Sequence, residues 1–486
     1  MQLNHDICYR AVQARDARFD GQFFTAVSST GIYCRPICPA TTPKPENCTF
    51  FACAAAAHEA GYRPCLRCRP EISPDLSASL GGSGIVSRAL RLIAEGALDE
   101  GSVSDLAAQL AVTERHLRRL FVEHLGAAPV VVAQTRRILF AKQLLDETAL
   151  PISEVALAAG FGSIRRFNDV MQTTYGRAPR ELRHGREEEP SGASPVAITL
   201  RLPFSPPYNW AAMVRSLAPK MTAGVETISA ERYRRTIAVN GRHGIVEVRP
   251  APGQNHLLAT IRHPSVGALG GIVERLRRMF DVSANAAAID GHLGADPILA
   301  PIVAAQPGQR VPGAWDNFEL AVRTILGQQI SVAAATTLAG RIAAAYGQPL
   351  SLEGAAPDEG LRRIFPTPAA LAEADLTGLG VIRSRAAAIQ SLAAAALADA
   401  SLLDSSQGLD QALERLCALP GIGPWTAHYF AMRGLREPDA FPASDLGLLK
   451  ALGAPGQPMT PRRLEALSAA WRPWRSYATM YLWAML

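Results

Sequence analysis

LPGIGPWTAHYF (Leu419–Phe430) is the stretch that decides the fold of the C-terminal half of this chain. It follows an amphipathic segment, Leu403–Cys417, and its two glycines allow a tight turn before a second apolar segment. The pattern predicts a helix, a hairpin and a second helix, with the amides of Gly421 and Gly423 at the hairpin. Such amides bind a phosphate without reading base sequence. The alternative is an ordinary turn between two helices.

An aspartate follows this hairpin in the stretch DAFPASDLGLLK (Asp439–Lys450). A lone aspartate among small and apolar residues often caps a helix. The distance of Asp445 from the hairpin, however, resembles the helix-hairpin-helix DNA glycosylase superfamily, in which this aspartate is essential. The resemblance is closest to the AlkA type, 3-methyladenine DNA glycosylase II. It spans residues 196–486 and includes the segments PPYNW, AVRTILGQQISVA and WRPWRSYATMYLW.

The resemblance implies hydrolysis of the N-glycosidic bond of an alkylated base. Asp445 would stabilise the oxocarbenium-like sugar, position water, or do both. A purine methylated at a ring nitrogen is cationic, and the positions that would hold it against electron-rich rings correspond to Trp425, Tyr429 and Trp483. Where the AlkA type has a leucine wedge, this chain has Gln329, a polar residue that would contact DNA at the extruded base. Trp471 and Trp474 are expected in the core.

Two absences from the sequence narrow the expected reaction to base removal alone. Relatives that also cut the strand have a Schiff-base lysine two residues after the hairpin, where this chain has Trp425; the nearest lysine, Lys450, lies beyond Asp445. No cysteine follows Cys417, which excludes the iron–sulfur cluster of other relatives. We therefore expect a monofunctional glycosylase.

Four cysteines form two tight pairs near the N-terminus, in GIYCRPIC (Gly31–Cys38) and RPCLRC (Arg63–Cys68). Disulfides, a structural zinc knot and a metal-bound nucleophile are the three possibilities. The N-terminus lacks the apolar core of a signal peptide, so we expect a cytoplasmic location, where thiols stay reduced. C-x3-C followed by C-x2-C then favours tetrahedral zinc. The predicted ligands are Cys34, Cys38, Cys65 and Cys68, and the remaining cysteines, Cys8, Cys48, Cys53 and Cys417, are expected to be buried thiols.

The residues around this cluster, ARDARFDGQFFTAV, TGIYCRPICPA and EAGYRPCLRCRP, resemble the N-terminal methyl-phosphotriester domain of the Ada protein. That resemblance implies that Cys34 is both a zinc ligand and the acceptor of a methyl group from a DNA phosphotriester. The product is a thioether, so the transfer happens once. Arg35 and Arg67 lie beside the ligands and are expected to contact phosphates. Four thiolates on Zn²⁺ leave a charge of about −2, and methylation relaxes it to about −1, which favours DNA binding.

An internal repeat follows the cysteine cluster. SVSDLAAQLAVTERHLRRLF (Ser102–Phe121) is echoed by PISEVALAAGFGSIRRFNDV (Pro151–Val170). Each copy has a short apolar helix, a turn and a second helix opened by Thr113 or Ser163, as in a helix-turn-helix. The alternative is a pair of ordinary helical hairpins. The spacing resembles the paired helix-turn-helix domain of the AraC family, and the arginines expected to contact DNA are Arg118, Arg119, Arg165 and Arg166.

Composition sets limits on these expectations. The chain has 486 residues, too many for one core, and 48% of them are hydrophobic. Its net charge of +6 is concentrated in residues 84–186 and does not by itself establish DNA binding. No run of eighteen apolar residues predicts a membrane span. Gly/Ser-rich and charged stretches at residues 77–84 and 184–195 are expected to be linkers.

The expected fold is multidomain, mainly α with α+β parts. It comprises a small zinc-bound α/β domain (1–76), an all-α paired helix-turn-helix domain (84–184), an α+β lobe (196–282) and an all-α helix-hairpin-helix glycosylase domain (283–486). The lobe is expected to have strands near 196–204, 233–239, 244–248 and 256–261, and helices near 209–217 and 266–279.

The expected function is alkylation-damage DNA repair with adaptive-response regulation. The cofactor would be Zn²⁺, and the partners would be damaged and promoter double-stranded DNA and RNA polymerase, with no membrane. Two helix-turn-helix units in one chain favour a monomer associated with the nucleoid. Two rivals stay open. One is a transcription regulator whose glycosylase half is only a DNA-binding scaffold, and the other is an enzyme whose zinc and helix-turn-helix segments only tether it to DNA.

Overall fold

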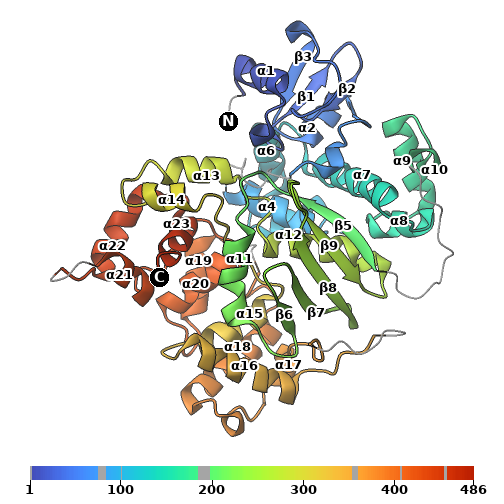
Figure 1. The fold of residues 1–486 in the computed structure, drawn as a ribbon. Coiled ribbons are helices and arrows are strands. Elements are labelled where there is room, and N and C mark those ends of the chain that lie inside the picture. Colours follow the sequence, from blue (N-terminus) through green and yellow to red (C-terminus); the bar gives the residue numbers. More distant parts are fainter. Residues whose placement is uncertain are drawn as a thin grey trace. The chain divides into compact units, whose positions relative to one another are not determined.

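A computed structural model describes residues 3–74, 84–99, 101–183, 197–352, 360–404, 408–453 and 457–486 (Figure 1). The chain folds into two compact units. The first comprises residues 1–206, 251–277 and 282–285, and the second comprises 207–250, 278–281 and 286–486. The α+β lobe expected at 196–282 is therefore divided between the two units. The two expected linkers lie outside the described residues, apart from Gly84, which begins a helix.

The N-terminal part of the first unit is built on a small sheet with strand order β3-β1-β2-β4. Its helices and strands are α1 (His5–Ala14), β1 (Phe24–Val27), β2 (Ile32–Cys34), β3 (Cys48–Phe51), α2 (Ala54–Glu59) and β4 (Arg63–Pro64). β1 pairs antiparallel with β2 and β3, and β2 pairs parallel with β4. Tyr33 is fully buried and packs edge-on against Phe24, with ring centroids 5.7 Å apart. This core fixes β2, which ends at Cys34.

The repeat in the sequence is also a repeat in the structure. The helices of this part are α4 (Gly84–Ala94), α5 (Val103–Gln109), α6 (Glu114–Leu125), α7 (Pro129–Glu147), α8 (Ile152–Ala158), α9 (Ile164–Tyr175) and α10 (Pro179–Leu182). The side chains of Thr113 and Ser163 cap α6 and α9 as expected. Gly126 and Gly176 end these helices at φ 73° and 68°, where a residue with a side chain would be strained. α5–α6 and α8–α9 are thus two helix-turn-helix units joined by α7.

The remaining strands of the chain are β5 (Ile198–Pro203), β6 (Glu226–Ile228), β7 (Tyr233–Val239), β8 (Arg242–Pro250) and β9 (His256–Arg262). β5 pairs antiparallel with β9, from Ile198 opposite Ile261 to Pro203 opposite His256. β6, β7 and β8 form an antiparallel meander in the second unit, where β7 and β8 run side by side (Figure 1). The expected strands are present, and β6 is an addition to them.

Two helices flank these strands in the chain near their expected places. α11 spans Trp210–Leu217 in the second unit, and Val266–Ala268 forms a 3-10 turn that leads into α12 (Leu269–Met279). Burial accounts for the spacing of the apolar residues in α12, because Ile272 and Leu276 have no exposed surface.

The rest of the second unit is helical, as the apolar spacing predicts. Its helices are α13 (Ala286–Leu293), α14 (Ala300–Ala305), α15 (Asn317–Leu326), α16 (Val332–Tyr346), α17 (Pro368–Leu371), α18 (Arg383–Ala398), α19 (Leu409–Cys417), α20 (Pro424–Arg433), α21 (Leu446–Leu452), α22 (Pro461–Ser468) and α23 (Arg475–Trp483). Trp471 has no exposed surface, as expected for a core residue. No helix in the described part of the chain combines the length and apolar content that crossing a bilayer requires.

Candidate functional site

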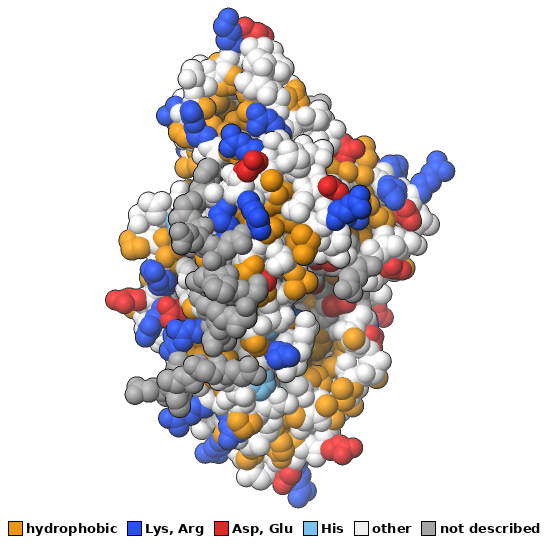
Figure 2. Space-filling model, turned by 90° about the vertical axis from the view of Figure 1, so that its right-hand side faces the viewer, with side chains coloured by type: hydrophobic (Ala, Val, Ile, Leu, Met, Phe, Trp, Pro, Cys, Tyr) orange, Lys and Arg blue, Asp and Glu red, His pale blue; other side chains and the backbone are white. Residues whose placement is uncertain are grey.

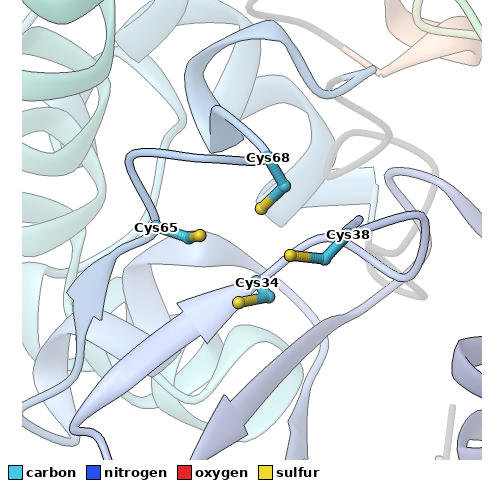
Figure 3. Close-up of side chains that lie close together, drawn as sticks. All are labelled: Cys34, Cys38, Cys65 and Cys68. Atoms are coloured by element: carbon cyan, nitrogen blue, oxygen red, sulfur yellow. The ribbon is translucent and has the colours of Figure 1, made fainter. Parts of the chain in front are cut away.

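Four sulfur atoms meet beside the end of β2. The Sγ atoms of Cys34, Cys38, Cys65 and Cys68 all lie within 4.8 Å of one another, and Figure 3 shows the four side chains turned together. Tetrahedral zinc with Zn–S bonds of about 2.3 Å places its sulfur ligands at comparable separations. The four cysteines therefore fit the ion, and no disulfide joins the described cysteines.

Exposure divides the four thiols into two pairs. Cys65 and Cys68 are buried, whereas Cys34 and Cys38 are half-buried. A groove of about 670 Å³ passes over the cluster, and Cys34 lies in its wall. The other polar and basic residues that line it are Thr25, Ser29, Thr30, Arg35, Thr41, Thr42, Lys44, Asn47, Arg63 and Arg67. A nucleophile that must reach a phosphotriester has to come from the accessible pair.

The two arginines predicted beside the ligands have different surroundings. Arg67 is exposed and lines the groove. Arg35 is 8% exposed, and its guanidinium binds the carboxylate of Asp20 through Nε at 2.9 Å and the carbonyl oxygen of Cys68 through Nη1 at 3.2 Å. Its backbone N–H also donates to the sulfur of Cys68, at 3.3 Å. A buried, paired guanidinium has little to offer a phosphate, so we withdraw Arg35 as an expected DNA contact and assign it to the support of the cysteine cluster.

The loop that contains Cys68 continues into a buried charge network. Arg69 has a left-handed backbone, φ 55°, and its Nε lies 2.9 Å from Oε1 of Glu71 and 3.1 Å from Oδ2 of Asp146 in α7. Lys142 reaches the same Asp146 oxygen at 2.5 Å and is 1% exposed. These contacts join the loop of a cysteine ligand to the helix that links the two helix-turn-helix units.

A second site surrounds Asp445 in the second unit. A cavity of about 300 Å³, at the lower end of the range for small-molecule sites, is lined by Asp445, Trp425, Tyr429 and Trp483. The Nε1 of Trp425 donates to Oδ2 of Asp445, and the Nε1 of Trp483 donates to Oδ1, each at 2.9 Å. Oδ1 also accepts the backbone N–H of Leu448 at 3.0 Å, so Asp445 caps α21. The two interpretations of Asp445, helix cap and reactive carboxylate, are thus compatible in one residue.

The three aromatic rings that line the cavity lie next to one another. Trp425 and Tyr429 are stacked, with centroids 5.3 Å apart and planes inclined by 18°. Tyr429 and Trp483 are 6.1 Å apart and inclined by 46°. Trp425 and Tyr429 are one turn apart on α20, which explains their shared face. The structure brings together the three rings that the sequence selected.

The hairpin before α20 has the geometry that its glycines predict. Gly421 has φ 77°, and a Cβ placed there would lie 2.6 Å from the Cβ of Ala388. Gly423 is the N-cap residue of α20, and a Cβ there would meet nothing within 4 Å. Gln328, which the sequence did not single out, donates from Nε2 to the carbonyl oxygen of Gly421 at 2.8 Å. Gln329 is exposed at φ 55°, a costly backbone conformation for a non-glycine residue.

Three basic side chains that sequence reasoning did not identify also line the cavity: Lys220, Arg323 and Arg433. Arg433 donates from Nη1 to the hydroxyl of Tyr429 at 2.7 Å. Burial raises the pKa of Tyr429, but Arg433 and Lys220 outweigh it and lower the pKa to about 8. Their spacing in the sequence does not predict that both lie near Tyr429, because Lys220 precedes the meander and Arg433 ends α20.

The predicted DNA-contacting arginines of the repeat are all exposed. Arg118 pairs with Glu114 one turn earlier, at 2.7 Å, and Arg119 lies beside His116. Arg165 and Arg166 open α9 on its solvent side. Basic side chains are dispersed among acidic and apolar ones over the face drawn in Figure 2. Their contact with DNA stays a prediction.

One expected burial is wrong. Cys8, Cys48 and Cys53 are buried thiols as predicted, but Cys417 is exposed. It is the last residue of the amphipathic helix α19, whose buried side is formed by Ala412 and Leu416. The helix ends with Cys417 turned away from that side.

Comparison with known families accounts for nearly the whole chain. The models that match are the metal binding domain of Ada at residues 7–71, a helix-turn-helix domain at 106–185, the AlkA N-terminal domain at 199–316 and the HhH-GPD superfamily base excision DNA repair protein at 322–476. A protein of Mycobacterium tuberculosis, the probable bifunctional transcriptional activator/DNA repair enzyme AlkA, is 45% identical over 100% of this chain and 97% of its own length. The chain belongs to this bifunctional AlkA family.

Two further comparisons match the two halves of this AlkA family member separately. DNA-3-methyladenine glycosylase 2 of Escherichia coli is 36% identical over 58% of this chain and 95% of its own length. The bifunctional transcriptional activator/DNA repair enzyme Ada of the same organism is 34% identical over 38% of this chain and 51% of its own length.

The fold of the glycosylase half has a solved counterpart. A 3-methyladenine DNA-glycosylase from Archaeoglobus fulgidus superposes with a TM-score of 0.52 at 21% identity, covering 58% of this chain and 97% of its own. The resemblance drawn from sequence, the multidomain fold and the zinc cofactor are confirmed.

Proposed function

We propose that this protein repairs alkylated DNA at two separate sites and uses one of them to regulate transcription. At the first site, Asp445 promotes hydrolysis of the N-glycosidic bond of an alkylated base held in the aromatic cavity. At the second, Cys34 accepts a methyl group from a DNA phosphotriester. Both proposals concern double-stranded DNA, which the matched helix-turn-helix and HhH-GPD families support.

The observation that supports the glycosylase proposal most strongly is the setting of Asp445. Its carboxylate accepts hydrogen bonds from both cavity indoles and from the backbone N–H of Leu448 in the first turn of α21, so it is held in one orientation beside the space for a base. A fixed anion there stabilises the positive charge that develops on the sugar as the base leaves, and it can accept a proton from the attacking water. The neighbouring rings offer electron-rich faces to a cationic purine.

Substituting Asp445→Asn tests this role without removing the helix cap, since asparagine caps helices as well as aspartate does. We expect excision of 7-methylguanine and 3-methyladenine to be lost while damaged-DNA binding persists. The matched control is Asp316→Asn, the same change at the N-cap of α15, where the carboxylate accepts only a capping N–H in the described contacts. Full excision by Asp445→Asn would overturn the role of Asp445, whereas no excision by the native chain would leave the glycosylase half as a DNA-binding scaffold, the rival function.

The methyl-transfer proposal rests on the groove over the cysteine cluster. When bound, zinc keeps the thiolates deprotonated at neutral pH. Cys34 is accessible from a groove lined by Arg63, Arg67 and Lys44, whose charges suit the phosphates beside a phosphotriester. The sulfur lone pair attacks the methyl carbon, and the bond to the phosphate oxygen breaks with its electrons. The leaving group is a phosphodiester anion, and the protein retains a thioether.

Peptide mass mapping after incubation with phosphotriester DNA should locate the transferred methyl on Cys34. Cys34→Ser should abolish the transfer, whereas Cys48→Ser, a buried thiol outside the cluster, should leave it intact. Zinc content measured in parallel separates the loss of a nucleophile from the loss of the metal. A methyl group found on Cys38 would overturn the assignment, because that thiol is equally accessible.

Regulation follows from the same reaction. Loss of one negative charge at the cluster strengthens DNA binding, and the exposed arginines of α6 and α9 supply contacts to a promoter. Two helix-turn-helix units in one chain allow this as a monomer, and recruitment of RNA polymerase on nucleoid DNA would complete activation. Promoter binding measured before and after methylation tests the switch.

A further inference from the structure

The cavity beside Asp445 is lined by more positive charge than a cation-binding site requires. Lys220, Arg323 and Arg433 all line it, and Asp445 is the only carboxylate among its described lining residues. A methylated purine such as 7-methylguanine is already positive, so any of these side chains whose charge is not paired repels it. Their presence points to a different kind of departing base.

Two of these three cations already have strong partners. Arg323 lies 3.0 Å from Glu226 and 2.9 Å from Glu319, both buried. Arg433 donates to the carbonyl oxygen of Pro312 at 2.8 Å and to the Tyr429 hydroxyl. The guanidinium groups of both arginines are therefore engaged in contacts that stabilise the walls of the cavity.

Lys220 differs from both arginines. It follows α11, half-buried, and its Nζ donates to the carbonyl oxygen of Ser216 at 3.2 Å and faces the hydroxyl of Tyr429. Among the described residues its ammonium has no carboxylate partner. Arg323 binds the backbone carbonyl of Lys220, which fixes the start of the side chain without occupying its charge. The ammonium of Lys220 therefore lies at the wall of the cavity with its charge not paired to a carboxylate among the described residues.

The charge of the damaged base decides whether a proton donor in the cavity speeds its removal. A cationic base leaves as a neutral molecule and needs no proton. A base that is uncharged in DNA leaves as an anion unless a proton reaches it, and this anion is a poor leaving group. A general acid in the cavity therefore selectively accelerates removal of uncharged bases.

We propose that Lys220 is the acid that protonates uncharged bases as they leave. The inference rests on the proposed glycosylase function of the same cavity. The C1′–N bond breaks with its electron pair going to the base, and a proton moves from Nζ of Lys220 to a ring nitrogen. Water adds to C1′ and gives up its proton to Asp445 or to solvent. Solvent then returns a proton to the neutral amine of Lys220.

The electrostatic setting of Lys220 suits this role. Burial lowers its pKa, the hydroxyl of Tyr429 raises it, and the positive charges of Arg433 and Arg323 lower it again, so that the pKa lies below the ordinary lysine value. A lysine with a lowered pKa gives up its proton more readily, which is what an acid working near neutral pH needs.

Single-turnover excision from two duplexes tests the proposal, one with 2′-deoxyinosine, whose base is uncharged, and one with 7-methylguanine, whose base is cationic. For Lys220→Gln we expect the deoxyinosine rate to fall by about 100-fold, the usual worth of a general acid. The 7-methylguanine rate should stay constant or rise, because a repelling charge has gone. Lys450→Gln, which removes an exposed lysine outside the cavity lining, is the matched control for lost charge in the same unit.

A second substitution separates proton donation from charge alone. Lys220→Arg keeps the positive charge but holds its proton too tightly to act as an acid, so we expect the deoxyinosine rate to stay low. Full recovery in Lys220→Arg, or an equal fall for both lesions in Lys220→Gln, would overturn the proposal. The glycosylase function itself fails only if the native chain excises neither base.

Discussion

Trp425 donates its indole N–H to Oδ2 of Asp445 at 2.9 Å, which ties a ring of the base cavity directly to the carboxylate beside it. The same ring is stacked on Tyr429. The ring that we propose holds a base in place therefore also orients the carboxylate that we propose acts on the sugar. The other oxygen of Asp445 is fixed by Trp483 and by the backbone of α21.

Replacing Trp425 by phenylalanine should slow excision by about tenfold or more. A hydrogen bond to a charged group contributes about 1.5–3 kcal/mol, and phenylalanine keeps a ring but loses the donor. Single-turnover rates on 7-methylguanine DNA measure the effect, with Trp474→Phe as the control for an indole outside the cavity lining. A rate equal to the native one would show that the second indole suffices to hold Asp445.

Tyr429 should ionise near pH 8, about two units below an ordinary tyrosine. Ultraviolet difference titration of the native protein against Tyr429→Phe isolates this group. Because Arg433 and Lys220 lower the folded-state pKa, ionised Tyr429 stabilises the fold. That contribution is complete above pH 10, the value for the unfolded chain, and is lost as pH falls through about 8. A single tyrosinate that appears only near pH 10 would contradict the contact with Arg433.

Sequence was sufficient wherever a site is built from neighbours in the chain. The spacing of Cys34 and Cys38, and of Cys65 and Cys68, predicted a metal cluster because each pair lies in one tight loop. Gly421 predicted the hairpin because its backbone conformation excludes most other residues.

Sequence failed where distant segments meet. Lys220 reaches Tyr429, and Gln328 reaches the hairpin, through tertiary packing that leaves no mark on local spacing. Arginine is a residue type that often contacts phosphate, so Arg35 was expected to do so. Only the structure shows that its charge is already paired with Asp20. The exposure of Cys417 depends on which side of α19 is packed, and apolar character alone does not decide this for the last residue of a helix.

Gly421→Ala should destabilise the second unit by about 2 kcal/mol or more. A left-handed backbone costs a residue with a side chain about 1–2 kcal/mol, and the new Cβ would overlap Ala388. Gly423→Ala is the matched control, since a Cβ there meets nothing and its φ is −94°. All six tryptophans lie at residue 210 or later, so denaturant unfolding followed by tryptophan fluorescence reports this unit alone. Equal midpoints for the two variants would contradict the hairpin geometry.

The contact between Arg69 and Asp146 predicts a measurable coupling between the cysteine loop and α7. Breaking a mostly buried ion pair leaves an uncompensated charge, and about a quarter of the Arg69 side chain is exposed, so we expect Arg69→Met to cost about 2 kcal/mol. In a double-mutant cycle with Asp146→Asn, the two effects should overlap by about 1 kcal/mol.

Hydrogen exchange in α7 measures this coupling in the first unit, while tryptophan fluorescence of the same samples should show no change in the second. Arg63→Met, at an exposed arginine of β4, controls for the loss of a charge near the cluster. Strictly additive effects of Arg69→Met and Asp146→Asn would mean that the two side chains do not share an interaction. A positive coupling would show that the contact between Arg69 and Asp146 links the loop of Cys68 to α7, the helix between the two helix-turn-helix units.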